Sequence, residues 1–188
     1  MNEQQAIQQT KQGNPSALAW LVGRYQLKAL RAAYLITHNH NSAEDVVQDV
    51  FLDLPDLLRS FDNSRPFEPW LMRVVVNRTL RQLSRDNRLA DLPDAHESEE
   101  WAAQWADSTS NPESAVQQRE LEDELWQQMQ KLSVEQRAAL VARYYLQMSE
   151  KEMASLADVP AGTIKWRLSR ARARLRQLFG DDPRKDVK

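Results

Sequence analysis

The sequence predicts an all-α protein built from two small helical domains that a flexible acidic linker joins. Apolar residues recur every three or four positions through most of the 188 residues, and few runs alternate as a half-buried strand requires. Between Leu89 and Pro112 this periodicity gives way to Pro, Ser, Asp and Glu, a composition typical of a linker. We therefore expect domains at residues 1–90 and 114–188, with the linker at 91–113.

In the first domain, the apolar spacing predicts three helices, at about 16–36, 42–58 and 69–88. The second helix is expected to begin at Ser42, because Asp45 three positions later completes the pattern of an N-cap and its N3 acid. The residues expected to face the core are Leu18, Leu21, Val22, Tyr25, Leu30, Ala33 and Tyr34 in the first helix, and Val46, Val47, Val50, Phe51, Leu54 and Leu58 in the second.

In the second domain, helical periodicity resumes at about Glu113. Two further helices are expected to begin at Ser133 and Ser149, because each serine is followed three positions later by Gln or Glu, the pattern of a capping box. A final helix starts near Pro160 and reaches about Phe179.

Composition excludes several classes of function. The chain has no cysteine, which rules out disulfides and cysteine nucleophiles, and its four glycines do not form a phosphate-binding glycine-rich loop. The start lacks the segments of a signal peptide and no apolar run approaches the roughly 20 residues of a membrane helix, so we expect a cytoplasmic protein without membrane insertion. The net charge of −2 hides a mostly acidic stretch at 91–124 and a basic one at 165–176. Such blocks indicate different partner surfaces.

The spacing of the last two helices predicts a DNA-binding helix-turn-helix. Ala157, Asp158 and Val159 form a short turn between them, and Asp tolerates the left-handed conformation that such a turn uses. Ile164 is expected to plug the core, while the opposite face of the last helix is cationic and polar. A solvated basic face is the alternative, but the turn spacing favours insertion of the helix into a major groove.

An acidic face and a basic ridge are expected on the first domain. One face of its second helix collects Asp45, Gln48, Asp49 and Leu52. This face suits a basic protein partner, and a solvated surface is the alternative. Its third helix carries, near i+4 spacing, Arg73, Asn77, Arg81, Arg85 and Arg88. Such a ridge can follow a nucleic-acid backbone.

Aromatic residues bracket the loop that precedes this ridge. The loop residues Asp62, Asn63, Ser64 and Arg65 lie between Phe61 and the pair Phe67 and Trp70. Rings beside hydrogen-bonding groups can hold the unstacked bases of a single strand. Core packing is the alternative for Phe67 and Trp70.

The chain resembles bacterial sigma factors of the extracytoplasmic-function (ECF) group of the sigma-70 family in three segments, in this order: SAEDVVQDVFLDL, FEPWLMRVVVNRTLRQLSRDNR and LSVEQRAALVARYYLQMSEKEMASLADVPAGTIKWRLSRARARLRQLF. The resemblance implies a region-two domain before the linker and a region-four domain after it. It also implies a transcription initiation factor that binds core RNA polymerase, directs it to specific promoters and aids their melting. A helix-turn-helix regulator that does not bind polymerase is the alternative, and it leaves the first domain unexplained.

The resemblance implies roles for individual residues. Docking on the clamp helices of the largest polymerase subunit is implied for Asp45, Gln48, Asp49 and Phe51, with packing alone as the alternative for Phe51. Contacts to the minus-ten element are implied for Asp62, Asn63, Ser64, Arg65, Phe67, Arg73, Asn77, Arg78 and Arg81. Contacts to the minus-thirty-five element are implied for Thr163, Lys165, Trp166, Arg167, Arg170 and Arg172. The polymerase flap region, promoter DNA and an anti-sigma factor are implied as further partners.

Two positions depart from the family pattern. Arg81 stands where an acid is frequent, and Trp166 stands where a small polar residue is usual. Promoter preference therefore does not transfer from the family. Trp101 and Trp105 lie four positions apart inside the linker, which indicates a short packed helix or a docking segment rather than a purely solvated tether.

We expect no catalytic residue, no cofactor and no metal. His38, His40 and Glu44 are the one set that could be read as metal ligands, but they fall in a polar turn without recognisable supporting groups. A solvated turn is the better interpretation of these three residues.

Overall fold

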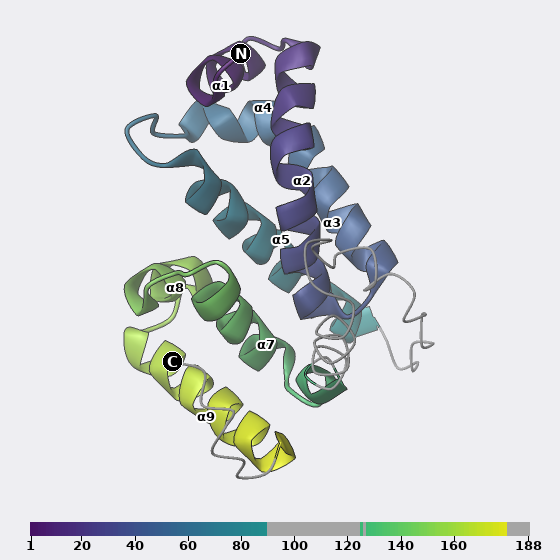
Figure 1. The fold of residues 1–188 in the computed structure, drawn as a ribbon, viewed down its shortest axis with the longest axis vertical. Helices are drawn as coiled ribbons and strands as arrows, with labels where there is room; N and C mark the ends of the chain where they lie inside the picture. Colours follow the sequence, from purple (N-terminus) through teal and green to yellow (C-terminus); the bar gives the residue numbers. More distant parts are fainter. Residues whose placement is uncertain (90–124, 126, 180–188) are drawn as a thin grey trace, which may run out of the picture.

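The computed structural model describes residues 1–89, 125 and 127–179, and in these ranges every regular element is a helix (Figure 1). The predicted all-α class is thereby confirmed for this part of the chain. None of the helices in the described ranges is both long and apolar enough to span a bilayer. The predicted linker at 91–113, its two tryptophans and the helix start near Glu113 lie outside the described residues.

The first half of the chain forms a helical bundle around an apolar core. Its elements are α1 (Glu3–Lys11), α2 (Pro15–Thr37), α3 (His40–Leu52), α4 (Leu54–Leu57), the 3-10 helix η1 (Leu58–Ser60) and α5 (Phe67–Leu89). Helices α2, α3 and α5 contact one another along the bundle, and α1 and α4 lie together at one end (Figure 1). The largest fully buried side chains include Leu21, Val46, Val50, Leu54, Leu58, Phe67, Leu71 and Val75. Burial of each such side chain contributes about 1.5–3 kcal/mol, so the bundle has a substantial core of its own.

Two helix starts differ from the sequence prediction. The cap of α3 is Asn39, whose Oδ1 accepts from the Ser42 N–H at 2.7 Å, so Ser42 lies inside the helix and is not its N-cap. His38 ends α2 in the left-handed conformation and delivers Asn39 in an extended one, which moves the cap three residues earlier. Helix α1 was not expected from the sequence, because only Ala6, Ile7 and Thr10 of its residues are buried. It begins with a capping box formed by Asn2 and Gln5.

Helix α3 also ends earlier than expected, at Leu52 instead of about Leu58. Pro55 has no N–H, and its ring would collide with the carbonyl of residue 51 if the helix continued. The helix therefore ends before Asp53, and a new helix, α4, begins at Leu54. The six residues predicted for the apolar stripe are nevertheless all buried, so that prediction is confirmed.

The second half of the chain follows the predicted pattern closely. Its elements are a helical stretch at 127–130, α7 (Val134–Leu140), the π-helix η3 (Val141–Tyr145), α8 (Glu150–Ala157) and α9 (Ala161–Phe179). Both predicted capping boxes are present. The Ser133 hydroxyl accepts from the Gln136 N–H at 3.4 Å, and the Ser149 hydroxyl accepts from the Glu152 N–H at 3.2 Å.

The two halves pack against each other. Ala32, Ile36 and Val76 of the first half belong to the same buried cluster as Leu140 and Met153 of the second. Helices α7 and α8 thereby contact α5, and α7 also contacts α2. The structure therefore packs the two helical units against each other through this shared apolar cluster.

Candidate nucleic-acid interface

The acidic face of α3 is available to a partner. Asp45, Gln48 and Asp49 are exposed, and the Leu52 side chain beside them is 67% exposed. Phe51, predicted for the same surface, is only 7% exposed and packs in the core of the first half. The face therefore consists of two carboxylates, one amide and one apolar side chain, without Phe51.

The loop at 62–66 has a defined shape. Asp62 accepts hydrogen bonds from the Ser64 N–H at 3.0 Å and from the Ser64 hydroxyl at 2.7 Å, and its carbonyl accepts from the Arg65 N–H at 3.0 Å. The bonds from Ser64 hold the pKa of the Asp62 carboxyl below its ordinary value. All five loop residues are exposed, so the turn displays polar groups to solvent on a prearranged backbone.

The aromatic side chains at the two ends of this loop anchor it to the core of the first half. Phe61 and Phe67 are 6% and 2% exposed, and their rings meet edge to face with centroids 5.7 Å apart. Trp70 lies against Phe61 at 4.7 Å and is only partly buried. Core packing is thus the observed role of both phenylalanines, and stacking on a base, which the sequence suggested, is not open to their buried rings. Phe67 can support the loop but does not reach its surface.

Helix α5 carries the basic ridge along one side. Arg81 and Arg85 are exposed, whereas Arg78 is paired with Asp53. Arg73 donates to Glu152 of α8 at 2.6 Å, so the ridge is tied at one point to the second half. Asn77 is half-buried between these cations. The side chain of Arg88, the last predicted member, lies outside the described residues.

The helix-turn-helix is formed as predicted. Asp158 adopts the left-handed conformation (φ 51°, ψ 48°) and ends α8, and the Val159 N–H returns to the Ala154 carbonyl at 3.1 Å. Ile164 and Leu168 of α9 are each 3% exposed and fix this helix on the core. The spacing in the sequence was sufficient to find this motif.

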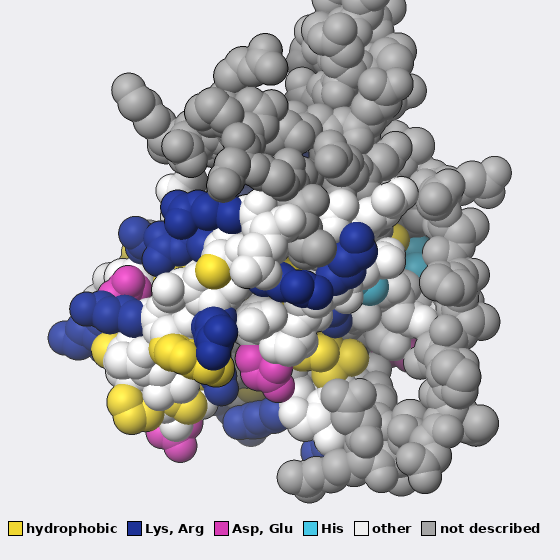
Figure 2. All heavy atoms as spheres, turned by 90° about the horizontal axis from the view of Figure 1, so that it is seen from below, with side chains coloured by type: hydrophobic (Ala, Val, Ile, Leu, Met, Phe, Trp, Pro, Cys, Tyr) yellow, Lys and Arg dark blue, Asp and Glu magenta, His cyan; other side chains and the backbone are white. Residues whose placement is uncertain are grey.

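The outer face of α9 presents its predicted polar residues. The exposed ones are Lys165, Trp166, Arg170 and Arg172, while Thr163 and Arg167 are half-buried. Trp166 is 58% exposed, and the Arg170 guanidinium lies over its ring at 5.6 Å. Figure 2 views the molecule from the end that lies lowest in Figure 1 and shows Lys and Arg side chains spread over the described part of that face.

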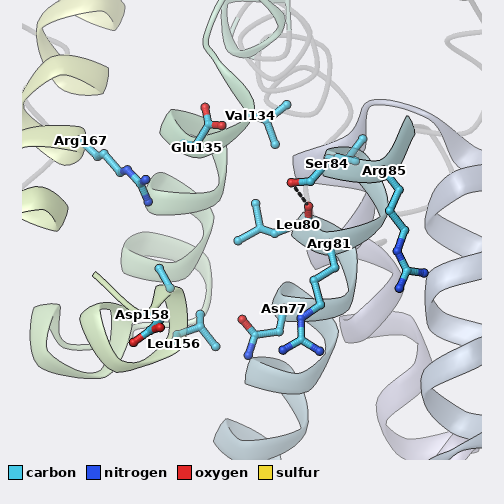
Figure 3. A pocket seen from close by; sticks show the side chains of 12 residues that line it. Asn77, Leu80, Arg81, Ser84, Arg85, Val134, Glu135, Leu156, Asp158 and Arg167 are labelled. Atoms are coloured by element: carbon cyan, nitrogen blue, oxygen red, sulfur yellow. Dashed lines mark hydrogen bonds between the residues drawn. The ribbon is translucent and has the colours of Figure 1, made fainter. Parts of the chain in front are cut away.

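A cavity of about 520 Å³ separates the two basic surfaces. Asn77, Arg81 and Arg85 of α5 line one side, and Arg167 of α9 lines the other (Figure 3). Leu80 of α5 and Leu156 of α8 contribute apolar walls. One residue of the α9 set, Arg167, therefore lines the same cavity as three residues of the α5 ridge.

The set of residues considered for a metal does not form a ligand cluster. The His40 Nδ1 lies 3.3 Å from a Glu44 carboxylate oxygen within one helix turn, whereas burial lowers the pKa of His38 to about 3, with the Arg137 charge adding to the effect. Among the described residues, no group of His, Asp and Glu is arranged to hold a metal ion.

Three residues of this region were not found from the sequence. Lys11 reaches the 62–66 loop from α1, Glu152 reaches Arg73, and Arg137 reaches the end of α2. These contacts join positions 52, 79 and 101 residues apart, and nothing in local spacing signals them. The capping pattern did single out Glu152, but for its own helix only.

Comparison with known proteins gives matches to both halves. Residues 21–89 match the family described as Sigma-70 region 2, and residues 122–175 match Sigma-70, region 4. The ECF RNA polymerase sigma factor SigW of Bacillus subtilis is 29% identical over 93% of this chain and 95% of its own. The ECF RNA polymerase sigma-E factor of Escherichia coli K12 is 30% identical over 92% of this chain and 91% of its own.

Solved structures with a similar fold include two complexes. CnrH, solved with the cytosolic domain of CnrY, superposes with a TM-score of 0.59 at 26% identity, covering 94% of this chain and 96% of its own. The sigma factor RpoE of Bartonella quintana, solved with the anti-sigma factor NepR, gives a TM-score of 0.60 at 21% identity, covering 86% of this chain and 98% of its own. The second likeness supports the fold alone.

Proposed function

The chain belongs to the ECF group of the sigma-70 family of RNA polymerase sigma factors, and from that membership we propose how its surfaces work. It is a transcription initiation factor that binds core RNA polymerase, directs it to specific promoters and aids their melting. The observation that carries this function is the presence, in one chain, of the prearranged 62–66 loop beside the α5 ridge and of a helix-turn-helix. A plain helix-turn-helix regulator would need only the last of these, so that alternative is not favoured.

We assign the polymerase contact to the acidic face of α3. Asp45, Gln48 and Asp49 are exposed on successive turns and would meet the clamp helices of the largest polymerase subunit. Phe51 supports this face from the core instead of contacting the partner. The second half would contact the flap region, as in the family.

The 62–66 loop and α5 are assigned to the minus-ten element. Asp62, Asn63, Ser64 and Arg65 would contact a base extruded from the melted strand, and Phe67 would hold the loop in place. The single strand and the duplex upstream of it would lie along α5, on Arg73, Asn77, Arg78 and Arg81. Unstacking a base costs a few kcal/mol, which capture of that base by the loop offsets.

Helix α9 is assigned to the minus-thirty-five element. Thr163, Lys165, Trp166 and Arg167 lie in its first two turns, the part of a recognition helix that enters the major groove. Arg170 and Arg172 follow on the exposed side and are placed for phosphates. The Arg170 contact with the Trp166 ring makes these two residues act as one surface.

The observed packing of the two halves represents a resting form. The two promoter elements are separated by about 25 base pairs, roughly 85 Å of B-DNA at about 3.4 Å per pair. A duplex cannot enter a cavity of about 520 Å³ to reach Arg81 and Arg167 together. The two halves would therefore have to separate when the factor binds polymerase and promoter.

The factor contributes binding energy and performs no chemical step of its own. We place it in the bacterial cytoplasm, where its polymerase and promoter are found. An anti-sigma factor is a further partner in this proposal, and CnrH, the structural neighbour at 26% identity, was likewise solved with a cytosolic protein domain bound. No metal or cofactor is part of this proposal.

The test is run-off transcription of fragmented genomic DNA by bacterial core polymerase with and without the protein. New transcripts that share upstream sequence elements would support the proposal and reveal the promoter. The matched control is the double substitution Arg167→Ala and Arg170→Ala, which should abolish those transcripts but leave core binding intact. If the wild-type chain did not bind core polymerase, the result would instead favour the alternative, a helix-turn-helix regulator that does not bind polymerase.

A further inference from the structure

Helix α1 brings one cation to the loop at 62–66. The Lys11 ammonium donates to Oδ1 of Asn63 at 3.0 Å and to the carbonyl oxygen of Phe61 at 3.3 Å, and it lies 5.9 Å from the centre of the Phe61 ring. Asn63 itself is exposed, and its Nδ2 has no partner among the described residues. One end of the amide is therefore engaged by Lys11 and the other faces solvent.

The chemistry of lysine fixes which end that is. An ammonium group has three N–H donors and no acceptor, so it can pair only with the oxygen of an amide. The Asn63 side chain is thereby held with its oxygen towards α1 and its two N–H donors outward. Without Lys11, the amide could turn over and present its oxygen instead.

Helix α1 is anchored well enough to act as a fixed support. Ala6, Ile7 and Thr10 are buried against the bundle, and Glu3 at its start accepts from the Tyr25 hydroxyl. The Tyr25 ring in turn meets Phe67, at the far end of the same loop, with centroids 5.3 Å apart. The support for Lys11 thus includes the core that anchors the loop.

We propose that Lys11 is a positioning residue for promoter recognition, which orients the Asn63 amide so that it offers hydrogen-bond donors to the extruded base. The proposal rests on the proposed function, because it assumes that the loop captures a base. Lys11 precedes residues 21–89, which match the family, so the family match assigns it no role. The expected preference is for a base whose exposed edge carries acceptors.

The experiment uses the full-length protein with core polymerase and four versions of its promoter that differ only in the extruded base. Open-complex formation on each version gives the ratio between the best and the worst base. The variants are Lys11→Gln, which can donate or accept, Lys11→Arg, which can only donate, and Lys11→Glu, which can only accept. Arg59→Gln is the charge-matched control, since Arg59 is exposed nearby and pairs with Asp56 outside the loop.

The Lys11→Gln variant should lower the base ratio by about tenfold, the scale on which correctly oriented donor pairs discriminate bases. Lys11→Arg should restore the ratio, Lys11→Glu should change the preferred base, and Arg59→Gln should leave the ratio unchanged. An equal loss on all four promoters would overturn the proposal, because it would reduce Lys11 to a charge or a fold contact. The proposal would also be overturned if the wild-type factor formed open complexes equally well on all four promoters. If the wild-type factor drives no promoter-specific transcription at all, the proposed function fails first, and the two failures are distinct.

Discussion

Arg137 of α7 donates its Nε–H to the carbonyl oxygen of Ile36, the penultimate residue of α2, at 2.8 Å. The same guanidinium donates to the Leu132 carbonyl at 2.9 Å, and the residue is only 9% exposed. Burial lowers the pKa of Arg137, yet a guanidinium keeps its proton at neutral pH. A buried charge therefore satisfies carbonyls from both halves of the chain at once.

Replacement of Arg137 by Ala should destabilise the fold. It would remove two charge-assisted hydrogen bonds and leave the two carbonyls unpaired in a dry interface, which costs about 2–4 kcal/mol in the free energy of unfolding. Chemical denaturation followed by circular dichroism measures this loss. Arg143→Ala is the control, because Arg143 is exposed and donates to Met148 within its own half; a smaller effect for Arg137 than for Arg143 would contradict the assignment.

His38 should make the protein sensitive to mild acid. Its pKa is lowered to about 3 in the folded state, mainly by burial, against about 6.5 in the unfolded chain. Between about pH 3 and pH 6.5, His38 is protonated in the unfolded chain but neutral in the folded protein. Stability is therefore full above about pH 6.5 and falls as the pH drops, by up to about 1.4 kcal/mol per pH unit.

The check is the free energy of unfolding between pH 5 and 8 for the wild type and for His38→Asn. Asparagine tolerates the left-handed conformation (φ 57°) that His38 adopts, so the variant keeps the end of α2 while losing the titrating group. Its stability should depend less on pH below about 6.5 than that of the wild type. Equal slopes for both proteins would show that His38 does not titrate in this way.

The local parts of this structure were predictable from the sequence, and the long-range parts were not. Capping boxes at Ser133 and Ser149, the left-handed Asp158 and the apolar stripe of α3 all depend on residues within a few positions of one another. The break at Pro55 follows an equally local rule, but the continuing stripe concealed it. The packing of α7 against α2 depends on contacts about 100 residues apart along the chain, and no periodicity encodes those.

For the candidate site the same division holds. The exposed acids of α3 and the outer face of α9 were expected from charge and spacing. Base stacking and core packing both stayed open for Phe67, because sequence shows that an aromatic flanks a loop but not which way its ring points; in the structure the rings of Phe61 and Phe67 are buried. The opposition of Arg81 and Arg167 across one cavity required the structure.

The pair of Arg73 and Glu152 should hold Arg73 away from DNA in the resting form. Glu152→Gln removes the charge but keeps the capping box, since glutamine serves at the same position of that motif. Both side chains are partly exposed, so the pair contributes at most about 1 kcal/mol. The variant should bind single-stranded minus-ten DNA about two- to fivefold more tightly, as measured by fluorescence anisotropy. Tighter binding that persists when Arg73 is also replaced by Ala would refute a release of Arg73.

Charge reversal on α3 should weaken the polymerase contact without disturbing the fold. Asp45→Lys and Asp49→Lys together place two like charges against a basic partner, and loss of affinity of at least about tenfold is expected. Competition for core polymerase against an unrelated sigma factor measures it. Asp56→Lys provides the control, because Asp56 is an equally exposed acid that lies in α4 and pairs with Arg59. Equal losses for the two proteins would point to a general effect of charge.

Two arginines of α9 should differ in what their loss does to promoter binding. Arg167 lies near the start of the helix, where base edges are read, so Arg167→Ala should cost about 1–3 kcal/mol at the preferred promoter and relax the choice of base there. Arg172 lies further along the helix, beyond its first two turns, and is exposed, so it is placed for a phosphate rather than for a base edge. Arg172→Ala should weaken binding to all promoters alike and reduce the salt dependence by about one counterion. Holoenzyme binding to promoter variants at several salt concentrations separates the two effects, and identical profiles for both variants would remove the distinction between a base-reading and a phosphate-binding part of α9.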